Sequence, residues 1–190
     1  VAGLEIGATW QYSTNAGTSW TNGSGTAATL STDGVKSVTV RQRDVAGNVS
    51  SASSALVFTL DTTAAAPTVT LATNSGSAAD SITNVGTLNV TGLESGATWQ
   101  YSTDGGTNWT TGSGTSATLT TEGANSVIVH QTDVAGNLSA DSSAFNFILD
   151  KTAPTLTPAS PTNGGLSQGL ASNISLGSNE SLALGIGTVS

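Results

Sequence analysis

Apolar and polar residues alternate in short runs along the chain, and Gly, Asn, Asp and Ser separate the runs. A period of two is typical of strands that bury one face, whereas helices bury every third or fourth residue. Between residues 62 and 150 the pattern predicts six strands, at 68–72, 88–91, 98–102, 116–120, 126–132 and 146–150. No stretch has the spacing of a helix, so we expect an all-β chain.

The sequence repeats itself, because residues 1–61 align with residues 90–150 without a gap and are identical at 41 of 61 positions. The offset is 90 − 1 = 89 residues, which is too long for a solenoid repeat and suits a β-sandwich of about 100 residues. We therefore expect tandem Greek-key β-sandwiches: the C-terminal part of a first unit (1–61), a complete second unit (62–150) and the N-terminal part of a divergent third unit (151–190). The linkers, 61–67 and 150–154, are short and end in Pro, which stiffens a joint.

The alternation also predicts which side chains form the core. Those expected to point inward are Val69, Leu71, Ala117, Leu119, Val127, Val129, Phe147 and Leu149. The opposite face of the strand at 126–132 carries Ile128, His130 and Thr132, and the first unit has Thr39, Arg41 and Arg43 at these positions. Because this face accepts charge, we expect it to lie in solvent.

The charge balance excludes some partners. Charged residues make up 8% of the chain, and 12 acidic residues against four basic ones give a net charge of −8. Nucleic acids and anionic membranes are recognised by basic surfaces, so neither is an expected partner, while multivalent cations are. The chain has no Cys, and it has no apolar run of about 20 residues, the length of a transmembrane helix. Because it starts at Val1, we expect it to be an excerpt of a longer protein.

Four segments carry a resemblance to a known family: the linkers "LDTTAAAPT" and "LDKTAPT", the stretch "GLESGATWQYSTDGG" and the strand ending "QTDVAGN". Together they resemble the bacterial Ig-like repeats of giant secreted, RTX-type surface adhesins. The resemblance implies tandem Ig-like sandwiches outside the cell, acting as an extender of a biofilm or host-attachment protein. It also implies Ca²⁺ at the junctions between neighbouring repeats of the same chain.

The acidic residues predict where such Ca²⁺ would bind, since this ion takes six to eight oxygen ligands. In an Ig-like sandwich one end gathers the incoming linker and two loops, and here these contribute Asp61, Glu94, Asp133 and Asn137. The alternative is that Asp133 to Asn137 forms a capped turn and that Asp61 and Asp150 cap the linkers.

Further candidates follow from the repeat. Glu5, Asp44 and Asn48 are the equivalents in the first unit, and Asp150 with Glu180 begins the same cluster for the third. The opposite end of a sandwich holds one loop with Asp80 and another with Asp33 or Glu122. These acids are expected to meet the linker of the next unit and to close a second site there.

Enzymatic function is not expected. No Cys nucleophile is present. His130 is the only His, and it is expected to face solvent, whereas a Ser-His-Asp site needs an oriented and shielded His. The stretch Ser102, Asp104, Gly106 and Trp109 resembles the Asp-box of glycan-processing propellers. Its Asp caps a hairpin, and the first unit carries Asn15 in its place, so we interpret the motif as structural.

Three alternatives to the spacer function remain open. The Trp residues would serve a glycan-binding module if they were exposed: Trp10, Trp20, Trp99 and Trp109. An accessory domain of a secreted hydrolase and a fibre that assembles by strand donation to the incomplete first unit are the others.

Overall fold

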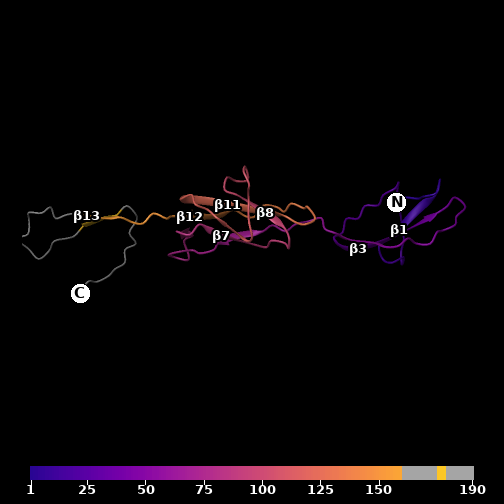
Figure 1. Ribbon diagram of the computed structural model, residues 1–190, viewed down its shortest axis with the longest axis horizontal. Helices are drawn as coiled ribbons and strands as arrows, with labels where there is room; N and C mark the ends of the chain where they lie inside the picture. The colour runs from indigo at the N-terminus through magenta and orange to yellow at the C-terminus, as the bar shows by residue number, and fades with distance from the viewer. Residues whose placement is uncertain (160–174, 179–190) are drawn as a thin grey trace, which may run out of the picture.

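The computed structural model describes residues 1–159 and 175–178, and every regular element in these ranges is a strand. The predicted all-β class is therefore confirmed. The first and second units lie end to end along the long axis of the molecule (Figure 1). Each sheet is built from strands of a single unit.

The second unit is a sandwich of two sheets. Three strands make one sheet in the order β10-β7-β5, and five make the other in the order β6-β12-β11-β8-β9. All pairings are antiparallel except that of β12 with β6. The strands are β5 (Thr68–Leu71), β6 (Ile82–Thr83), β7 (Thr87–Thr91), β8 (Thr98–Ser102), β9 (Thr110–Thr111), β10 (Ser116–Thr118), β11 (Gly123–Thr132) and β12 (Phe145–Leu149).

The core of this sandwich contains the side chains that the alternation predicts. Val127, Val129 and Leu149 are fully buried, and Val69, Leu119 and Phe147 are nearly so. Leu71 and Ala117 are half-buried and pack against the cluster. Leu88, Val90 and Trp99 complete it. Burial of about ten such side chains is the main force holding the two sheets together.

The outer face of β11 differs from the prediction that it lies in solvent. The side chain of His130 is only 9% exposed, and Ile128 and Thr132 are half-buried. The prediction failed because the connection from β8 to β9 folds back across this face and places the ring of Trp109 3.7 Å from that of His130.

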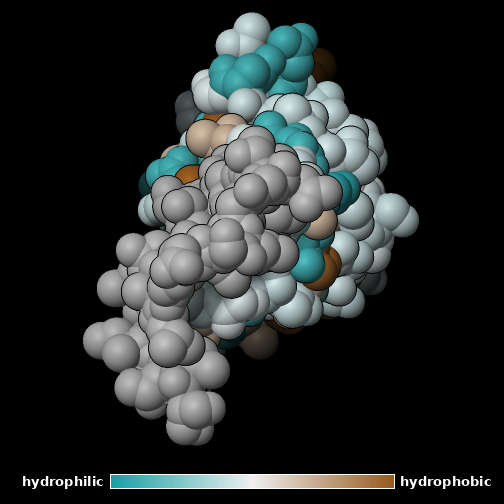
Figure 2. All heavy atoms as spheres, turned by 90° about the vertical axis from the view of Figure 1, so that its left-hand side faces the viewer, coloured by the Kyte–Doolittle hydropathy of each residue, from teal (hydrophilic) through white to brown (hydrophobic). Residues whose placement is uncertain are grey.

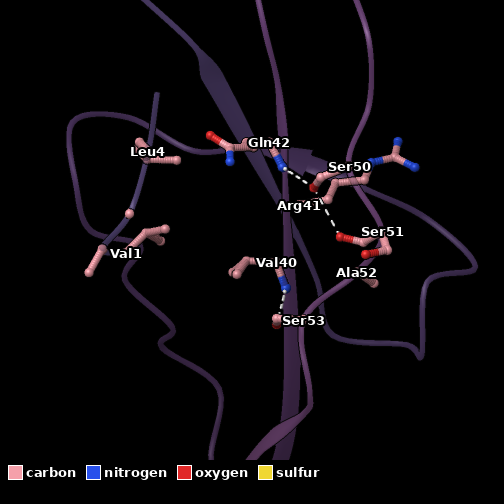
Figure 3. A pocket seen from close by; sticks show the side chains of 11 residues that line it. Val1, Leu4, Val40, Arg41, Gln42, Ser50, Ser51, Ala52 and Ser53 are labelled. Atoms are coloured by element: carbon pink, nitrogen blue, oxygen red, sulfur yellow. Dashed lines mark hydrogen bonds between the residues drawn. The ribbon is translucent and has the colours of Figure 1, made fainter. Parts of the chain in front are cut away.

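The first unit reproduces one sheet of the second, in the order β2-β1-β3-β4. Its strands are β1 (Thr9–Ser13), β2 (Thr21–Asn22), β3 (Gly34–Arg43) and β4 (Leu56–Leu60), each displaced by 89 residues from its counterpart. Within the described residues no second sheet covers it, so Leu56 is 64% and Phe58 37% exposed. A shallow pocket of about 210 Å³ lies against the end of β3, between Val1–Leu4 and the serines at 50, 51 and 53 (Figure 3).

The third unit begins with β13 (Leu156–Ala159), which pairs antiparallel with β14 (Ser175–Ser178). Viewed end on, the described surface is largely pale, as expected for residues of intermediate hydropathy, with separate hydrophilic areas and few strongly apolar ones (Figure 2). Among the described residues no helix is long and apolar enough to cross a membrane.

Candidate metal centre

The first junction brings three predicted acidic residues together. Asp61 follows β4 at the end of the first unit, Glu94 lies between β7 and β8, and Asp133 follows β11. One carboxylate oxygen of each lies within 4.8 Å of the other two. Two ligands of one Ca²⁺ at about 2.3–2.6 Å are separated by at most roughly 5.2 Å, so this spacing fits a shared ion.

Asp133 is held in a turn by Asn137, the fourth predicted residue. The backbone N–H of Asn137 donates to Asp133 Oδ1 and its Nδ2 donates to Oδ2, both at 2.8 Å. The side-chain amide of Asn137 is the main cause that lowers the pKa of Asp133 below its usual value, while burial opposes the shift. Asp133 is therefore ionised at neutral pH, and each of its oxygens keeps a lone pair for a cation.

Asn137 also contacts the linker, because its Nδ2 donates to the backbone carbonyl of Asp61 at 3.1 Å. It thus acts as a donor that positions two of the acids. A ligand role through its side-chain oxygen stays a prediction. Asn137 therefore holds Asp61, from the first unit, next to Asp133, from the second.

The same acids also cap turns, as the alternative interpretation predicts. Asp61 Oδ1 accepts from the N–H of Thr63 at 3.3 Å, and Asp150 Oδ1 accepts from that of Thr152 at 3.0 Å. In the first unit Asp44 and Asn48 form the same turn as Asp133 and Asn137, and the pKa of Asp44 is lowered by the same amide contact. Capping alone therefore does not require an ion, whereas the convergence of three carboxylates is a property of the junction.

At the opposite end of each unit, Asp33 and Glu122 meet the linker that follows, as expected, through hydrogen bonds. Asp33 Oδ1 accepts from both the N–H and the Oγ1 of Thr62, at 3.1 and 2.7 Å. Glu122 does the same one unit later, accepting from Lys151 N at 3.0 Å and Thr152 Oγ1 at 3.2 Å. Each of these acids holds the linker that leaves its own unit.

The other predicted residues are not brought into a second cluster. Asp80 accepts from the N–H of Ile82 at 2.9 Å, and in residues 1–159 no group of three acids includes Asp80 or Glu122. The N–H of Glu5 donates to Gln42 Oε1 at 3.0 Å, as the N–H of Glu94 does to Gln131, and in residues 1–159 no group of three acids includes Glu5 or Asp44. Glu180 lies outside the described residues, so the site at Asp150 stays a prediction. The second site at Asp80 stays a prediction as well.

The hairpin motif is structural in both units, as predicted. Asp104 Oδ1 accepts from Ser102 Oγ at 2.8 Å and from the N–H of Asn108 at 2.9 Å. Ser102 Oγ in turn accepts from the N–H of Gly106 at 2.9 Å. The backbone N–H of Asn108 is the main cause that lowers the pKa of Asp104 to about 2. In the first unit Asn15 accepts from the N–H of Ser19 at 2.9 Å in the same way.

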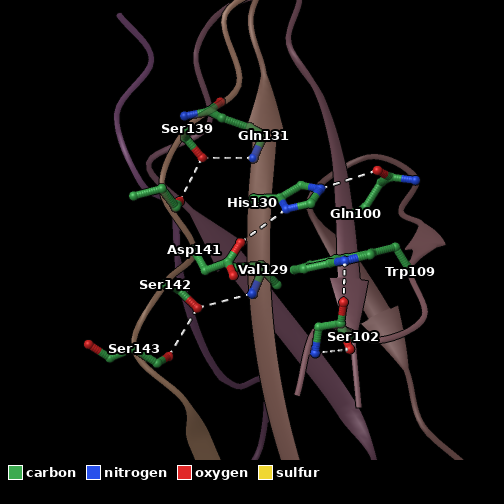
Figure 4. Close-up of polar contacts among 12 residues, drawn as sticks. Gln100, Ser102, Trp109, Val129, His130, Gln131, Ser139, Asp141, Ser142 and Ser143 are labelled. Carbon is green, nitrogen blue, oxygen red and sulfur yellow. Dashed lines mark hydrogen bonds and ion pairs between the residues drawn. The ribbon is translucent and has the colours of Figure 1, made fainter. Parts of the chain in front are cut away.

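The Trp at the end of each hairpin covers a polar residue of the central strand. In the second unit His130 stacks on Trp109 and contacts Asp141 and Gln100, at 3.1 and 3.2 Å (Figure 4). In the first, Arg41 lies 4.1 Å from the ring centre of Trp20. The two remaining Trp rings, Trp10 and Trp99, are 4% and 3% exposed.

Gln131 is a residue of the junction that the sequence reasoning missed. It is fully buried and contacts both the linker and the loop that carries Glu94. Two signals pointed to it: it lies two residues beyond Val129, on the core face of the strand, and the first unit has Gln42 at the same position.

Comparisons with known proteins add no identification. No protein-family model matches the chain, and no similar sequence was found among curated proteins.

Proposed function

We propose that the chain is a structural extender of a secreted bacterial surface adhesin, made rigid by Ca²⁺ at the junctions between its units. The observation that supports this best is the meeting of Asp61, from the first unit, with Glu94 and Asp133, from the second, within 4.8 Å. Oxygen-only donors, negative charge and a shared centre are what Ca²⁺ prefers, and waters complete its coordination.

The expected effect of the ion follows from electrostatics. Without a cation, three carboxylates at one joint repel each other, and the repulsion is smallest when the two units separate or tilt. An ion bound only by the aligned arrangement stabilises that arrangement by mass action. Extracellular modules bind Ca²⁺ with dissociation constants of about 10⁻⁴–10⁻³ M, so the rod would stiffen after export, where Ca²⁺ is abundant.

In this proposal the partners of the segment are neighbouring repeats of the same chain, and its location is extracellular, at the bacterial cell surface. The end-to-end arrangement in Figure 1 suits a spacer that carries a binding tip away from the cell. The glycan-binding alternative has less support, because two Trp rings are buried and the other two are covered on one face by Arg41 and His130.

The test is thermal unfolding together with small-angle scattering, in EGTA, in 10 mM Ca²⁺ and in 10 mM Mg²⁺. With a dissociation constant near 0.1 mM, 10 mM Ca²⁺ stabilises the second unit by about 2.7 kcal/mol. For a domain of this size the melting temperature then rises by on the order of 10–20 °C. The maximum dimension from scattering should lengthen in Ca²⁺. Mg²⁺ should change neither the melting temperature nor the maximum dimension by much.

Asp133→Asn removes one carboxylate of the site, and Asp44→Asn is its matched control, since Asp44 forms the same turn without the junction. The proposal predicts that the first variant loses most of the response to Ca²⁺ and that the second keeps it. Equal melting temperatures in EGTA and Ca²⁺ for the unaltered chain would contradict a calcium-stiffened junction.

A further inference from the structure

Gln131 makes a closed set of hydrogen bonds at the first junction. Its Nε2 donates to the backbone carbonyls of Ala65, at 2.7 Å, and Gly92, at 3.1 Å. Its Oε1 accepts from the N–H of Glu94 at 2.8 Å, and the N–H of Ala65 donates to Glu94 Oε1 at 2.9 Å. The amide thus uses both donors and its acceptor, and it is fully buried.

These contacts connect two segments that the sequence places far apart. Ala65 belongs to the linker, while Gly92 and Glu94 belong to the loop between β7 and β8. Gln131 lies near the end of strand β11 and points away from His130 (Figure 4). The side chain of Glu94 makes the second connection, because its Oε1 accepts from the N–H of Ala65, and Gln131 in turn holds the N–H of Glu94.

The linker is held at three points within five residues. Asn137 holds the carbonyl of Asp61, Asp33 holds Thr62, and Gln131 holds Ala65. Asp33 belongs to the first unit and the other two to the second. A short segment fixed from both sides has few remaining directions, so the angle between the units is restricted by hydrogen bonds before any cation is involved.

We infer that Gln131 is the positioning residue of the junction: it fastens the linker to the second unit and so sets both the direction of the first unit and the place of Glu94. This rests on the proposed function for its biological meaning, a rod of fixed angle. The first unit repeats part of the arrangement, since Gln42 Oε1 accepts from the N–H of Glu5 at 3.0 Å, but Gln42 contacts no linker residue in the described chain.

The first test measures the angle without an ion. The chain has no Cys, so the exposed residues Ser37 and Ser126 can be changed to Cys and spin-labelled. Pulsed electron paramagnetic resonance in EGTA then measures the distance between the two labels. Gln131→Met keeps the length of the side chain and removes its hydrogen bonds. We expect the distribution of label distances to become at least twice as broad, while the matched control Gln42→Met leaves it unchanged.

An unchanged distribution in Gln131→Met, with the second unit folded, overturns the inference. If that variant does not fold, amide hydrogen exchange of the unaltered chain decides the question. The N–H of Glu94 donates to Gln131 Oε1, so exchange of this amide at least tenfold slower than in the unfolded chain supports the inference, and exchange at the unfolded rate overturns it.

The second test measures Ca²⁺ affinity in the same variants. Residues that orient metal ligands from outside the coordination sphere change affinity by about 10–100-fold, so we expect binding in Gln131→Met to be about tenfold weaker and binding in Gln42→Met to be unaltered. If the unaltered chain binds no Ca²⁺, the proposed function fails, and the distance distributions still decide the role of Gln131. If all three proteins bind equally and the distributions are the same, the inference fails and the proposed function stands.

Discussion

The contact between Gly112 and Trp99 gives a stability prediction that the structure allows to be worked out. A Cβ atom at Gly112 would lie 2.1–2.4 Å from three atoms of the Trp99 indole, whereas carbon atoms in contact prefer about 3.5–4.0 Å. Trp99 is 3% exposed and donates its Nε1–H to the carbonyl of Gly114 at 2.8 Å. Gly112→Ala therefore forces the largest ring of the core to move.

The expected loss of stability has two parts. Overfilling a packed core costs about 1–3 kcal/mol, and the displaced indole loses a hydrogen bond worth about 1 kcal/mol. We therefore expect Gly112→Ala to destabilise the second unit by about 2–4 kcal/mol, a large fraction of the roughly 5–15 kcal/mol that holds a domain folded. Gly23 meets Trp10 in the same way in the first unit.

The assay is a urea titration followed by the amide NMR signals of the second unit. Gly114→Ala is the control, because a Cβ there meets nothing within 4 Å and only the positive φ of 57° opposes it, at about 1 kcal/mol. The same loss of stability in both variants would refute the steric argument, since it would leave only the backbone conformation as a cause.

Three further predictions concern stability. Asp104 has a folded pKa of about 2, below its usual 3.8, so its contribution to stability is present above about pH 4 and is lost as the pH falls toward 2. The urea midpoints at pH 7 and pH 2.5 should therefore differ less in Asp104→Asn than in the unaltered chain. His130→Ala removes the stack on Trp109 and should destabilise the second unit by about 1–2 kcal/mol in denaturant titrations, and no change would contradict the stack. Ala16 has a φ of 55° where its counterpart is Gly105, so Ala16→Gly should stabilise the first hairpin by about 1 kcal/mol, measured as slower amide exchange near Ser13.

The strands and the core could be predicted from the sequence because alternation depends on local pattern alone. All six predicted strands of the second unit are present, and Val127, Val129, Phe147 and Leu149 are buried as expected. The two missed strands, β6 and β9, are two residues long each, and a period of two cannot be detected in so short a run. The partner of β6 is also far along the chain, since Ile82 pairs with Ile148 of β12.

The candidate site could be predicted only in part. Comparing the units identified the acids, and the linker, the β7–β8 connection and the segment after β11 do bring Asp61, Glu94 and Asp133 together. The sequence did not reveal that His130 is covered, because the turn before Trp109 determines where that ring lies. It did not reveal the contacts of Gln131 either, since a buried amide is recognised by its partners, which come from two segments distant from it in the sequence.

The measurement that tests the central claim most directly is a calorimetric titration of the unaltered chain with Ca²⁺ at pH 7. The account predicts saturable binding at the first junction with a dissociation constant of about 10⁻⁴–10⁻³ M, lost in Asp61→Asn and kept in Asp44→Asn. Binding that is the same in both variants, or no binding up to 10 mM Ca²⁺, would contradict a calcium site at this junction.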